Sequence, residues 1–370
     1  MASKLFSPIK LREVTVPNRV VLSPMCQYSA VDGVPSDWHI LHLGSFAASG
    51  IGLLIAEATG VEDIGRITLG CPGLYNDEQE ESFSRIFDIC RKYGGAKLGM
   101  QLAHAGRKAS TKFPWEGGKP LTKSEGAWET IAPSADPFSE GWHRPKHMDS
   151  SDMDRVKNAF IASARRADRM GIDVLEIHMA HGYLFSQFLS PIANHRNDEF
   201  GGSLENRVRY PLDVFSAVRE IWPEKKALGV RISATDWEEP GWTIEDSVFF
   251  AERLKDLKCD FLVCSSGGNL ATRPPVANLG QGYQVPLAAR VKSETGITTM
   301  AVGMIRDPEY AENLISDGKA DLVAIARGFL YEPGWTRRAA EELGGELFYP
   351  LQYQRAMPEN WSKAFPSRQA

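Results

Sequence analysis

Residues 173–188, DVLEIHMAHGYLFSQF, join a buried apolar run to a cluster of polar rings. The first half is apolar on both sides of the period-two alternation, which is typical of a parallel strand covered on both faces. The second half places His178, His181 and Tyr183 at the end of that run or just past it. One histidine is usually a core or surface residue, but three such rings at one strand end indicate a functional site.

Seven further apolar runs occur along the chain, and helical patterns separate them. The eight runs are RVVLSPM from Arg19, GLLIAEA from Gly52, KLGMQLA from Lys97, DVLEIHM from Asp173, ALGVRIS from Ala227, DFLVCSS from Asp260, ITTMAVG from Ile297 and DLVAIAR from Asp321. Eight alternations of strand and helix predict a closed (β/α)8 TIM barrel rather than an open sheet. We also expect an N-terminal hairpin ahead of the barrel.

The helical patterns have recognisable ends. They cover residues 77–94, 150–171, 206–222, 243–257 and 306–318. The second opens with Ser/Asp capping candidates and closes on Gly171, while Thr243 and Asp246 form a variant of the capping box.

No linker divides the chain, so we predict a single TIM-barrel domain over residues 1–355 and a C-terminal tail over 356–370. Two loop insertions are expected, 106–147 after the third strand and 190–207 after the fourth. Both follow the strand ends that carry the active site in TIM barrels.

Composition narrows the class of protein. The chain has 370 residues, of which 43% are apolar and 24% charged. Its net charge is −5, and the sequence contains no block of like charges. This argues against a nucleic-acid or membrane partner, and no run approaches the ~20 residues of a membrane span. Five irregularly spaced cysteines without a CxxC predict reduced thiols in a cytoplasmic protein and no cysteine-ligated metal.

The last two strand ends have the composition of a phosphate site. Gly303 opens one loop, and Ala326, Arg327 and Gly328 end the eighth strand. Backbone N–H groups beside small residues can close on an anion, and arginine can add a bidentate pair. TIM barrels often bind phosphate in these loops, although turn glycines and a surface-paired arginine would give the same pattern.

Two polar residues at other strand ends suit the edge of a heterocycle. Gln101 and Arg231 end the third and fifth strands. An arginine beside the N1/C2 carbonyl region of a flavin stabilises the negative charge gained on reduction. Taken alone, Arg231 is equally consistent with a structural ion pair.

These motifs resemble the Old Yellow Enzyme family of FMN-dependent ene-reductases, in particular its thermophilic-like branch, which includes the xenobiotic reductases. The resemblance covers residues 5–355. Its landmarks include LFSPIKLREVTVPNRVVLSPMCQYSA, GMQLAHAGRKAS, HMAHGYLFSQFLSPIANHRNDEFGGSLENRVRY and DLVAIARGFL. The third of these is long and irregular, so chance agreement is not a reasonable explanation.

The resemblance implies an FMN cofactor. Residues implied to contact it are Ser23, Pro24, Met25, Cys26, Ala58, Gln101, Arg231, Gly303, Met304, Ala326 and Arg327. Cys26 stands where classical members have threonine, near flavin O4 and N5. Without the resemblance, a small core residue is the better interpretation of a buried free cysteine.

The implied activity is that of an NADPH dehydrogenase and ene-reductase. NADPH or NADH reduces FMN, and N5 then passes hydride to the β-carbon of an α,β-unsaturated carbonyl or nitro compound. His178 and His181 are implied to grip the substrate oxygen, Tyr183 to protonate the α-carbon, and Tyr28 to touch the substrate.

The segment PLQYQRAMP, residues 350–358, resembles the tail of the branch, in which an arginine enters the neighbouring subunit's active site. This implies a homodimer or homotetramer with Arg355 as a substrate contact. A solvated arginine on a mobile tail is the alternative, and Trp361 is a second candidate. Val302 replaces a tryptophan of the xenobiotic reductases, so their substrate range is not implied.

Three other functions are weaker. A metal site would have to use Glu176, His178 and His181, and no further clear ligand set appears, so no metal is expected. A barrel aldolase or lyase needs a Schiff-base lysine at a strand end, whereas Lys108 lies in the following loop. A non-catalytic binding barrel does not explain the density of polar groups at the strand ends.

Overall fold

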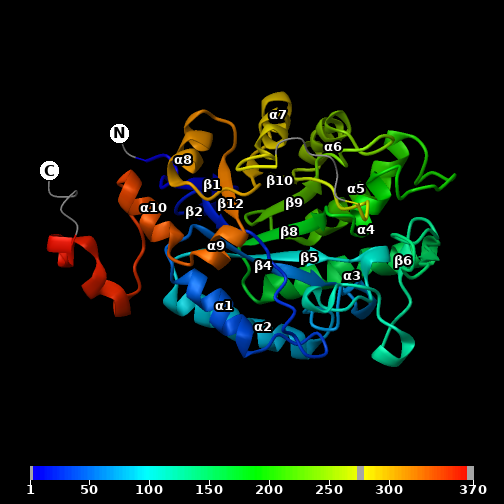
Figure 1. The fold of residues 1–370 in the computed structure, drawn as a ribbon, viewed down its shortest axis with the longest axis horizontal. Helices are drawn as coiled ribbons and strands as arrows, with labels where there is room; N and C mark the ends of the chain where they lie inside the picture. The colour runs from blue at the N-terminus through cyan, green and yellow to red at the C-terminus, as the bar shows by residue number, and fades with distance from the viewer. Residues whose placement is uncertain (1–2, 273–278, 365–370) are drawn as a thin grey trace.

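The computed structural model describes residues 3–272 and 279–364, and it contains the expected closed barrel (Figure 1). The strands are parallel and follow the order β10-β11-β12-β3-β4-β5-β8-β9 around the barrel. Their bounds are β3 Val20–Leu22, β4 Leu53–Gly60, β5 Lys97–Ala103, β8 Val174–Met179, β9 Ala227–Ser233, β10 Phe261–Ser265, β11 Thr299–Ala301 and β12 Leu322–Ile325. All eight apolar runs therefore form the predicted strands, and the (β/α)8 fold is confirmed.

Helices cover the outside of the barrel. They are α1 Asp37–Ala47, α2 Asp77–Tyr93, α3 Ser150–Arg169, α4 Leu184–Leu189, α5 Leu204–Ile221, α6 Ile244–Asp256, α7 Val285–Thr295, α8 Pro308–Ser316, α9 Arg327–Tyr331 and α10 Trp335–Leu343. The five predicted helices correspond to α2, α3, α5, α6 and α8. Helices α1, α4, α7, α9 and α10 were not predicted, and of these α4 has only six residues and α9 only five.

The helix ends follow the expected capping chemistry. Asp149, one residue ahead of the predicted start, caps α3 by accepting a hydrogen bond from the Asp152 N–H at 2.9 Å. Gly171 follows α3 with φ +73°, a conformation that costs glycine little. Thr243 and Asp246 form the predicted capping box of α6.

The additions to the barrel also match the prediction. β1 (Ile9–Leu11) and β2 (Val14–Val16) form the N-terminal antiparallel hairpin. The insertion 106–147 holds short 3-10 turns and a two-stranded sheet of β6 (Ile131–Ala132) and β7 (Lys146–His147). This insertion lies beyond the C-terminal end of β5, so it is placed to cover the barrel mouth.

Strand register sets the positions of the polar residues in the barrel. Glu176 on β8 lies opposite Gln101 on β5 and Gly229 on β9. His178, two residues further along β8, lies opposite Arg231. Since side chains alternate between the two faces of a strand, Glu176 and His178 point the same way, with Glu176 deeper in the barrel.

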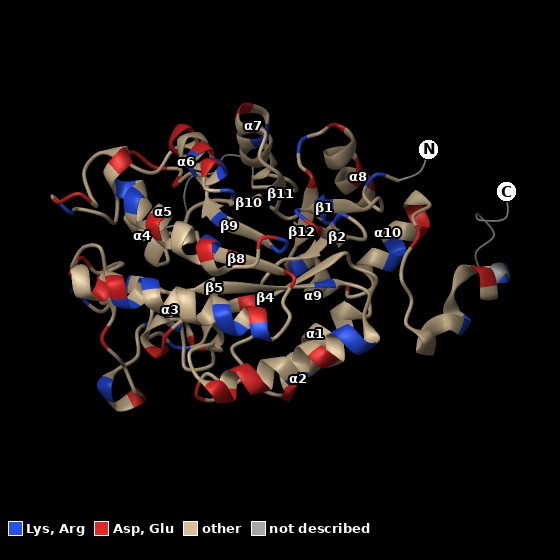
Figure 2. Ribbon diagram, turned by 180° about the vertical axis from the view of Figure 1, so that it is seen from behind, with Lys and Arg blue, Asp and Glu red and all other residues tan. Residues whose placement is uncertain are grey.

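The ribbon in Figure 2 is coloured by charge, and both Lys/Arg and Asp/Glu positions occur along the helices on the side that it shows. Beyond α10, the chain continues as short 3-10 turns, Leu351–Ala356, Pro358–Asn360 and Ser362–Ala364, which stand away from the barrel in both ribbon views. Within residues 3–272 and 279–364, no helix combines the length and the apolar character needed to cross a membrane.

Candidate active site

A cavity of about 450 Å³ opens at the C-terminal ends of the strands. It brings together six of the eleven residues predicted to contact FMN. These are Ser23, Arg231, Gly303, Met304, Ala326 and Arg327. They come from four different strand ends, those of β3, β9, β11 and β12, as a site at the mouth of a TIM barrel requires.

The cavity attracts anions. Three guanidinium groups, those of Arg231, Arg306 and Arg327, contribute to its wall, and no carboxylate is among its described lining residues. Gly303 has φ +115°, and a Cβ there would lie 3.1 Å from the backbone nitrogen of Gln284. A side chain at position 303 would therefore strain the backbone and narrow this end of the cavity.

The remaining five predicted residues lie outside that wall. Cys26 is half-buried in the segment that follows β3, together with Pro24 and Met25. Ala58 is buried on β4, next to a register irregularity between Ala56 and Ala58.

Gln101, the fifth of these residues, belongs to a buried polar group beside the cavity. Its Nε2 donates to Glu176 Oε1 at 2.5 Å, and Arg231 Nη1 donates to Ser23 Oγ at 2.9 Å. Glu176 Oε2 and Arg231 Nε are buried without a hydrogen-bond partner in the described part of the chain. Orphaned buried polar atoms are rare, so their presence beside a cavity fits a bound polar ring.

The protonation of Glu176 is shifted by its surroundings. Burial raises the pKa of its carboxyl to about 7, although the charge of Arg231 and the Gln101 hydrogen bond act in the opposite direction.

The two predicted imidazoles meet at the end of β8. His178 Nε2 lies 3.3 Å from His181 Nδ1, and their rings are edge-on with centroids 5.0 Å apart. Burial, followed by the charge of Arg231, lowers the pKa of both rings well below its ordinary value. Both histidines are therefore neutral at physiological pH.

Neighbouring groups fix the orientation of both rings. The Ala180 N–H donates to His178 Nδ1 at 3.2 Å, which leaves the proton of this neutral ring on Nε2. His181 Nε2 lies 2.8 Å from Ser265 Oγ, and Gln284 Nε2 lies 3.1 Å from the same oxygen.

The backbone of His181 is held in a strained conformation. Its φ is +62°, which is uncommon for a residue with a side chain. Its N–H donates to Ser233 Oγ at 2.8 Å, and Lys108 Nζ donates to its carbonyl at 2.8 Å and to that of Gly268 at 2.9 Å. A Cβ on Gly268 would lie only 2.2 Å from the His181 carbonyl carbon, so the two loops approach each other closely.

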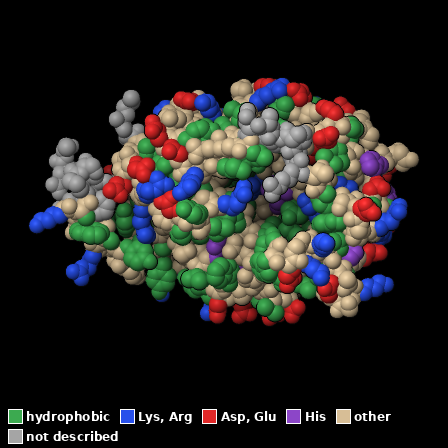
Figure 3. All heavy atoms as spheres, in the orientation of Figure 1, with side chains coloured by type: hydrophobic (Ala, Val, Ile, Leu, Met, Phe, Trp, Pro, Cys, Tyr) green, Lys and Arg blue, Asp and Glu red, His purple; other side chains and the backbone are tan. Residues whose placement is uncertain are grey.

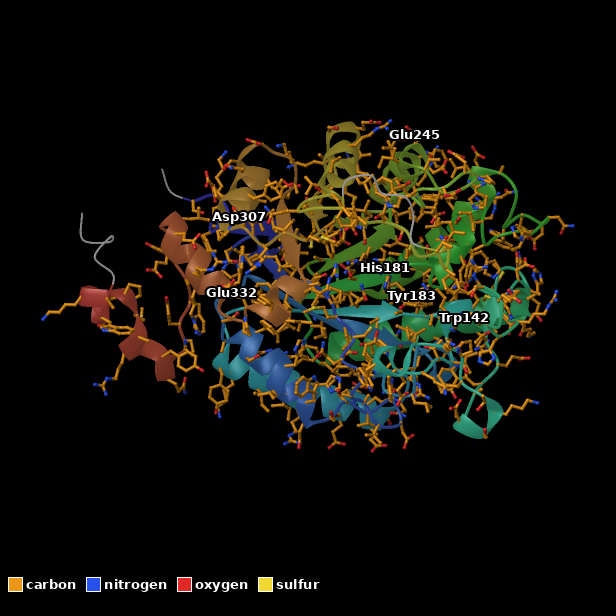
Figure 4. All side chains as sticks on the ribbon, viewed as in Figure 1. Trp142, His181, Tyr183, Glu245, Asp307 and Glu332 are labelled. Atoms are coloured by element: carbon orange, nitrogen blue, oxygen red, sulfur yellow. The ribbon has the colours of Figure 1, made fainter. Side chains whose placement is uncertain are left out.

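Two tyrosines complete the site. The Tyr183 ring packs edge-on against His178 at 5.1 Å, and burial raises the pKa of its phenol well above the usual value. Tyr28 packs edge-on against Trp115 at 5.7 Å. A second cavity of about 300 Å³ touches both tyrosines and Trp142 of the covering insertion. Trp142, Tyr183 and His181 are labelled in Figure 4. Figure 3, in the same orientation, shows histidine and basic side chains near the centre of the face that it draws.

Two sequence candidates lie elsewhere or serve another purpose. Arg355 is exposed within Leu351–Ala356 and contributes to neither cavity of its own chain. Lys108, the lysine nearest a strand end in the sequence, donates hydrogen bonds from its ammonium to two backbone carbonyls. In the described ranges, no group of three His, Cys, Asp or Glu side chains is arranged to hold a metal.

Several residues of the site were not predicted. Ser265 adjoins His181, Gln284 donates to Ser265, Ser233 anchors the His181 backbone, and Arg306 lines the larger cavity. Ser265 lies in the apolar run DFLVCSS, but nothing in the sequence pairs it with a histidine 84 residues earlier. Gln284 carries no local signal.

Known proteins with similar sequences are enzymes of one type. Residues 4–346 match the model of the NADH:flavin oxidoreductase / NADH oxidase family. A protein named NADPH dehydrogenase from Geobacillus sp. (strain WCH70) is 43% identical over 96% of this chain and 99% of its own. The protein of the same name from Bacillus subtilis (strain 168) is 40% identical with the same coverage.

Solved structures agree with this assignment. Morphinone reductase aligns with a TM-score of 0.76 and 25% identity, over 94% of this chain and 91% of its own. The same enzyme in complex with tetrahydroNAD aligns with a TM-score of 0.73 and 26% identity, over 94% and 92%. These matches establish an oxidoreductase with FMN as cofactor and a nicotinamide as reductant. The chain belongs to the NADH:flavin oxidoreductase / NADH oxidase family, and within it to the Old Yellow Enzyme group of FMN-dependent ene-reductases.

Proposed function

We propose that the protein reduces the activated C=C bond of α,β-unsaturated aldehydes, ketones, imides or nitro compounds, with NADPH or NADH as the source of electrons. The observation that carries this proposal is the meeting of His178 Nε2 and His181 Nδ1, 3.3 Å apart, beside the ring of Tyr183. A single oxygen can accept a hydrogen bond from two nitrogens that converge in this way.

The cavity residues suit FMN. When bound, FMN supplies the chemistry that accepts a hydride from the nicotinamide and gives it to the alkene. Arg327, with the loop at Gly303 and Met304 and with Ala326, would hold the phosphate, because these groups form the basic wall of the larger cavity. Arg231 and Gln101 would hold the polar edge of the ring, and Ser23 to Cys26 and Ala58 would flank it.

The histidines are proposed to polarise the substrate oxygen. His178 carries its proton on Nε2 because Nδ1 accepts from the Ala180 N–H. His181 offers a second proton from Nδ1 when Ser265 donates to its Nε2. Two fixed N–H donors stabilise negative charge on an oxygen without the cost of moving solvent, and they withdraw electron density from the β-carbon.

Tyr183 is proposed as the proton donor. Its raised pKa keeps the phenol protonated at neutral pH, so a proton is available for the α-carbon. The ammonium of Lys108 lies 5.3 Å from the centre of the Tyr183 ring and favours the phenolate that forms when the proton leaves.

Two further substrate contacts belong to the proposal. Tyr28 lines the smaller cavity with Tyr183. Arg355 would reach the active site of a second copy of the chain in a homodimer or homotetramer, since it lines neither cavity of its own chain.

Replacing Tyr183 by Phe separates the two halves of the reaction. The variant should reduce FMN with NADPH at nearly the wild-type rate and should oxidise it with an enone at least about 100-fold more slowly, the usual contribution of a general acid. Anaerobic stopped-flow absorbance measures each half separately. Tyr93→Phe, which removes an exposed phenol on α2, is the control and should match the wild type. Equal slowing of both halves in Tyr183→Phe would contradict its role as proton donor.

A further inference from the structure

Glu176 is a buried carboxylate to which neither the family resemblance nor the reaction assigns a role. Its side chain is fully buried on β8, one alternation deeper in the barrel than His178. It accepts the 2.5 Å hydrogen bond from Gln101 Nε2, while its second oxygen has no described partner. A carboxylate in this position is costly, which calls for a compensating function.

An ionised carboxylate dictates the orientation of the amide next to it. A carboxylate can only accept hydrogen bonds, so it must face the NH₂ group of Gln101. The carbonyl Oε1 of Gln101 is then left free, and no donor in the described chain reaches it. A protonated carboxyl has an O–H of its own and can instead donate to Oε1, which permits the amide to turn over.

We propose that Glu176 is a positioning residue that makes Gln101 present its carbonyl, rather than its NH₂ group, to the ring site, and that its charge offsets that of Arg231 there. The inference rests on the proposed location of the flavin edge beside Gln101 and Arg231. A carbonyl suits a ring N–H, such as the one at flavin N3, whereas an NH₂ group would face it donor to donor. The negative charge of Glu176 also opposes the negative charge that a flavin gains on reduction.

The charged surroundings of Glu176 make this effect depend on pH. On β9, Arg231 is the charged group that acts on it; on β5, Gln101 is neutral; and on β8 itself, His178 is neutral because its pKa is lowered. The pKa of Glu176 is raised to about 7, mainly by burial. Its charge is therefore largely absent at pH 6 and largely present at pH 8.

The test is the midpoint potential of bound FMN in the wild type and in E176Q, measured by anaerobic spectroelectrochemistry from pH 6 to 8. Glutamine is neutral at every pH and resembles the protonated carboxyl. The two proteins should have similar potentials at pH 6. At pH 8 the potential of E176Q should be higher by at least about 30 mV, which for two electrons is a tenfold change in the reduction equilibrium constant. A difference that stays constant with pH would overturn the proposal, because a merely structural role has no reason to follow the charge.

Controls separate this inference from the proposed site. D236N removes another buried carboxylate, one bonded to Ser190 and Asn269, and should leave the pH dependence of the potential unchanged. If E176Q does not bind FMN, E176D replaces it, because aspartate keeps the charge and withdraws from Gln101. E176D should bind FMN more weakly, while its potential should follow pH as that of the wild type does; unchanged FMN affinity would overturn the positioning role. If Gln101→Ala binds FMN as tightly as the wild type, the proposed ring location itself fails.

Discussion

The barrel mouth and the C-terminal segment, residues 344–364, differ in how their side chains are held. At the mouth, Gln101, His178 and Arg231 stand on buried strands whose register fixes their neighbours. In the C-terminal segment, Leu351 is 82% exposed and Tyr353 48% exposed, on turns that stand away from the barrel. The mouth is organised by its own chain, while the segment exposes apolar surface that its own chain does not cover.

The two regions differ in how many neighbours hold each side chain. Each mouth residue is constrained by neighbours on two strands, so its position is overdetermined. Two contacts of the C-terminal segment are with the rest of the chain at Leu347, which lies against Gly50, and at Tyr353, over whose ring Arg337 lies at 5.0 Å. Exposed aromatic and aliphatic side chains of this kind are typical of a surface that another molecule covers.

The largest effect is expected when the positive charge of Arg231 is removed from the barrel mouth. Arg231→Ala should weaken FMN binding by about 100-fold or more, ~2.8 kcal/mol, because the ring edge loses a charged donor and Glu176 loses its nearby cation. Fluorescence titration of the apoprotein with FMN measures this. Arg209→Ala on the surface of α5 is the control. Unchanged FMN affinity in Arg231→Ala would mean that the mouth is not organised around the cofactor.

A second test addresses the imidazole pair. The double variant His178→Ala, His181→Ala should bind phenols, which mimic an enolate, about 30-fold more weakly, because two hydrogen bonds of ~1 kcal/mol each are lost. Perturbation of the flavin spectrum on titration reports the affinity. His147→Ala, an exposed histidine on β7, should have no effect. Phenol affinity equal to that of the wild type would remove the proposed oxygen site.

The same pair predicts a pH dependence of stability. The pKa of both rings is lowered in the folded protein, whereas unfolded histidine binds a proton below pH ~6.5. As pH falls from 6.5, the unfolded chain takes up protons that the folded chain refuses, so stability is lost. The double alanine variant lacks this loss and should gain on the wild type by ~1 kcal/mol per histidine between pH 6.5 and 5.5. Urea unfolding at each pH measures the gap, and a constant gap would show that the rings titrate normally.

The smallest expected effect lies in the C-terminal segment. Arg355→Ala should raise KM for an enone about threefold and leave FMN binding intact, as expected for one exposed charged contact supplied by a second copy. Steady-state kinetics over a range of protein concentrations detects it. Lys363→Ala, in the same segment, is the control. If Arg355→Ala lowered FMN affinity as Arg231→Ala does, the division between the two regions would be wrong.

The sequence predicted the parts that repeat and missed those that depend on contacts between distant residues. Eight strands could be recognised because burial on both faces leaves an unbroken apolar run, and Thr243 with Asp246 marked the start of α6. The family and its cofactor followed from long motifs. Ser265 and Gln284 could not be predicted, because their role depends on the fold bringing Ser265 to His181 and Gln284 to Ser265.

The least predictable residue in the site is Glu176. In the sequence it is one polar residue inside an apolar strand, and its position beside His178 suggests only a metal ligand. Its partner Gln101 lies 75 residues away, and only the barrel register brings the two together. The individual roles of the site residues, the domain boundary at residue 355 and the role of Arg355 remain predictions.

The most direct measurement is the absorbance spectrum of the purified protein through one cycle. The protein should be yellow with bound FMN, should be bleached by NADPH without oxygen, and should recover its colour when an α,β-unsaturated ketone is added. A colourless protein that does not take up added FMN, or a bleached flavin that no enone reoxidises, would contradict an ene-reductase built at the mouth of this barrel.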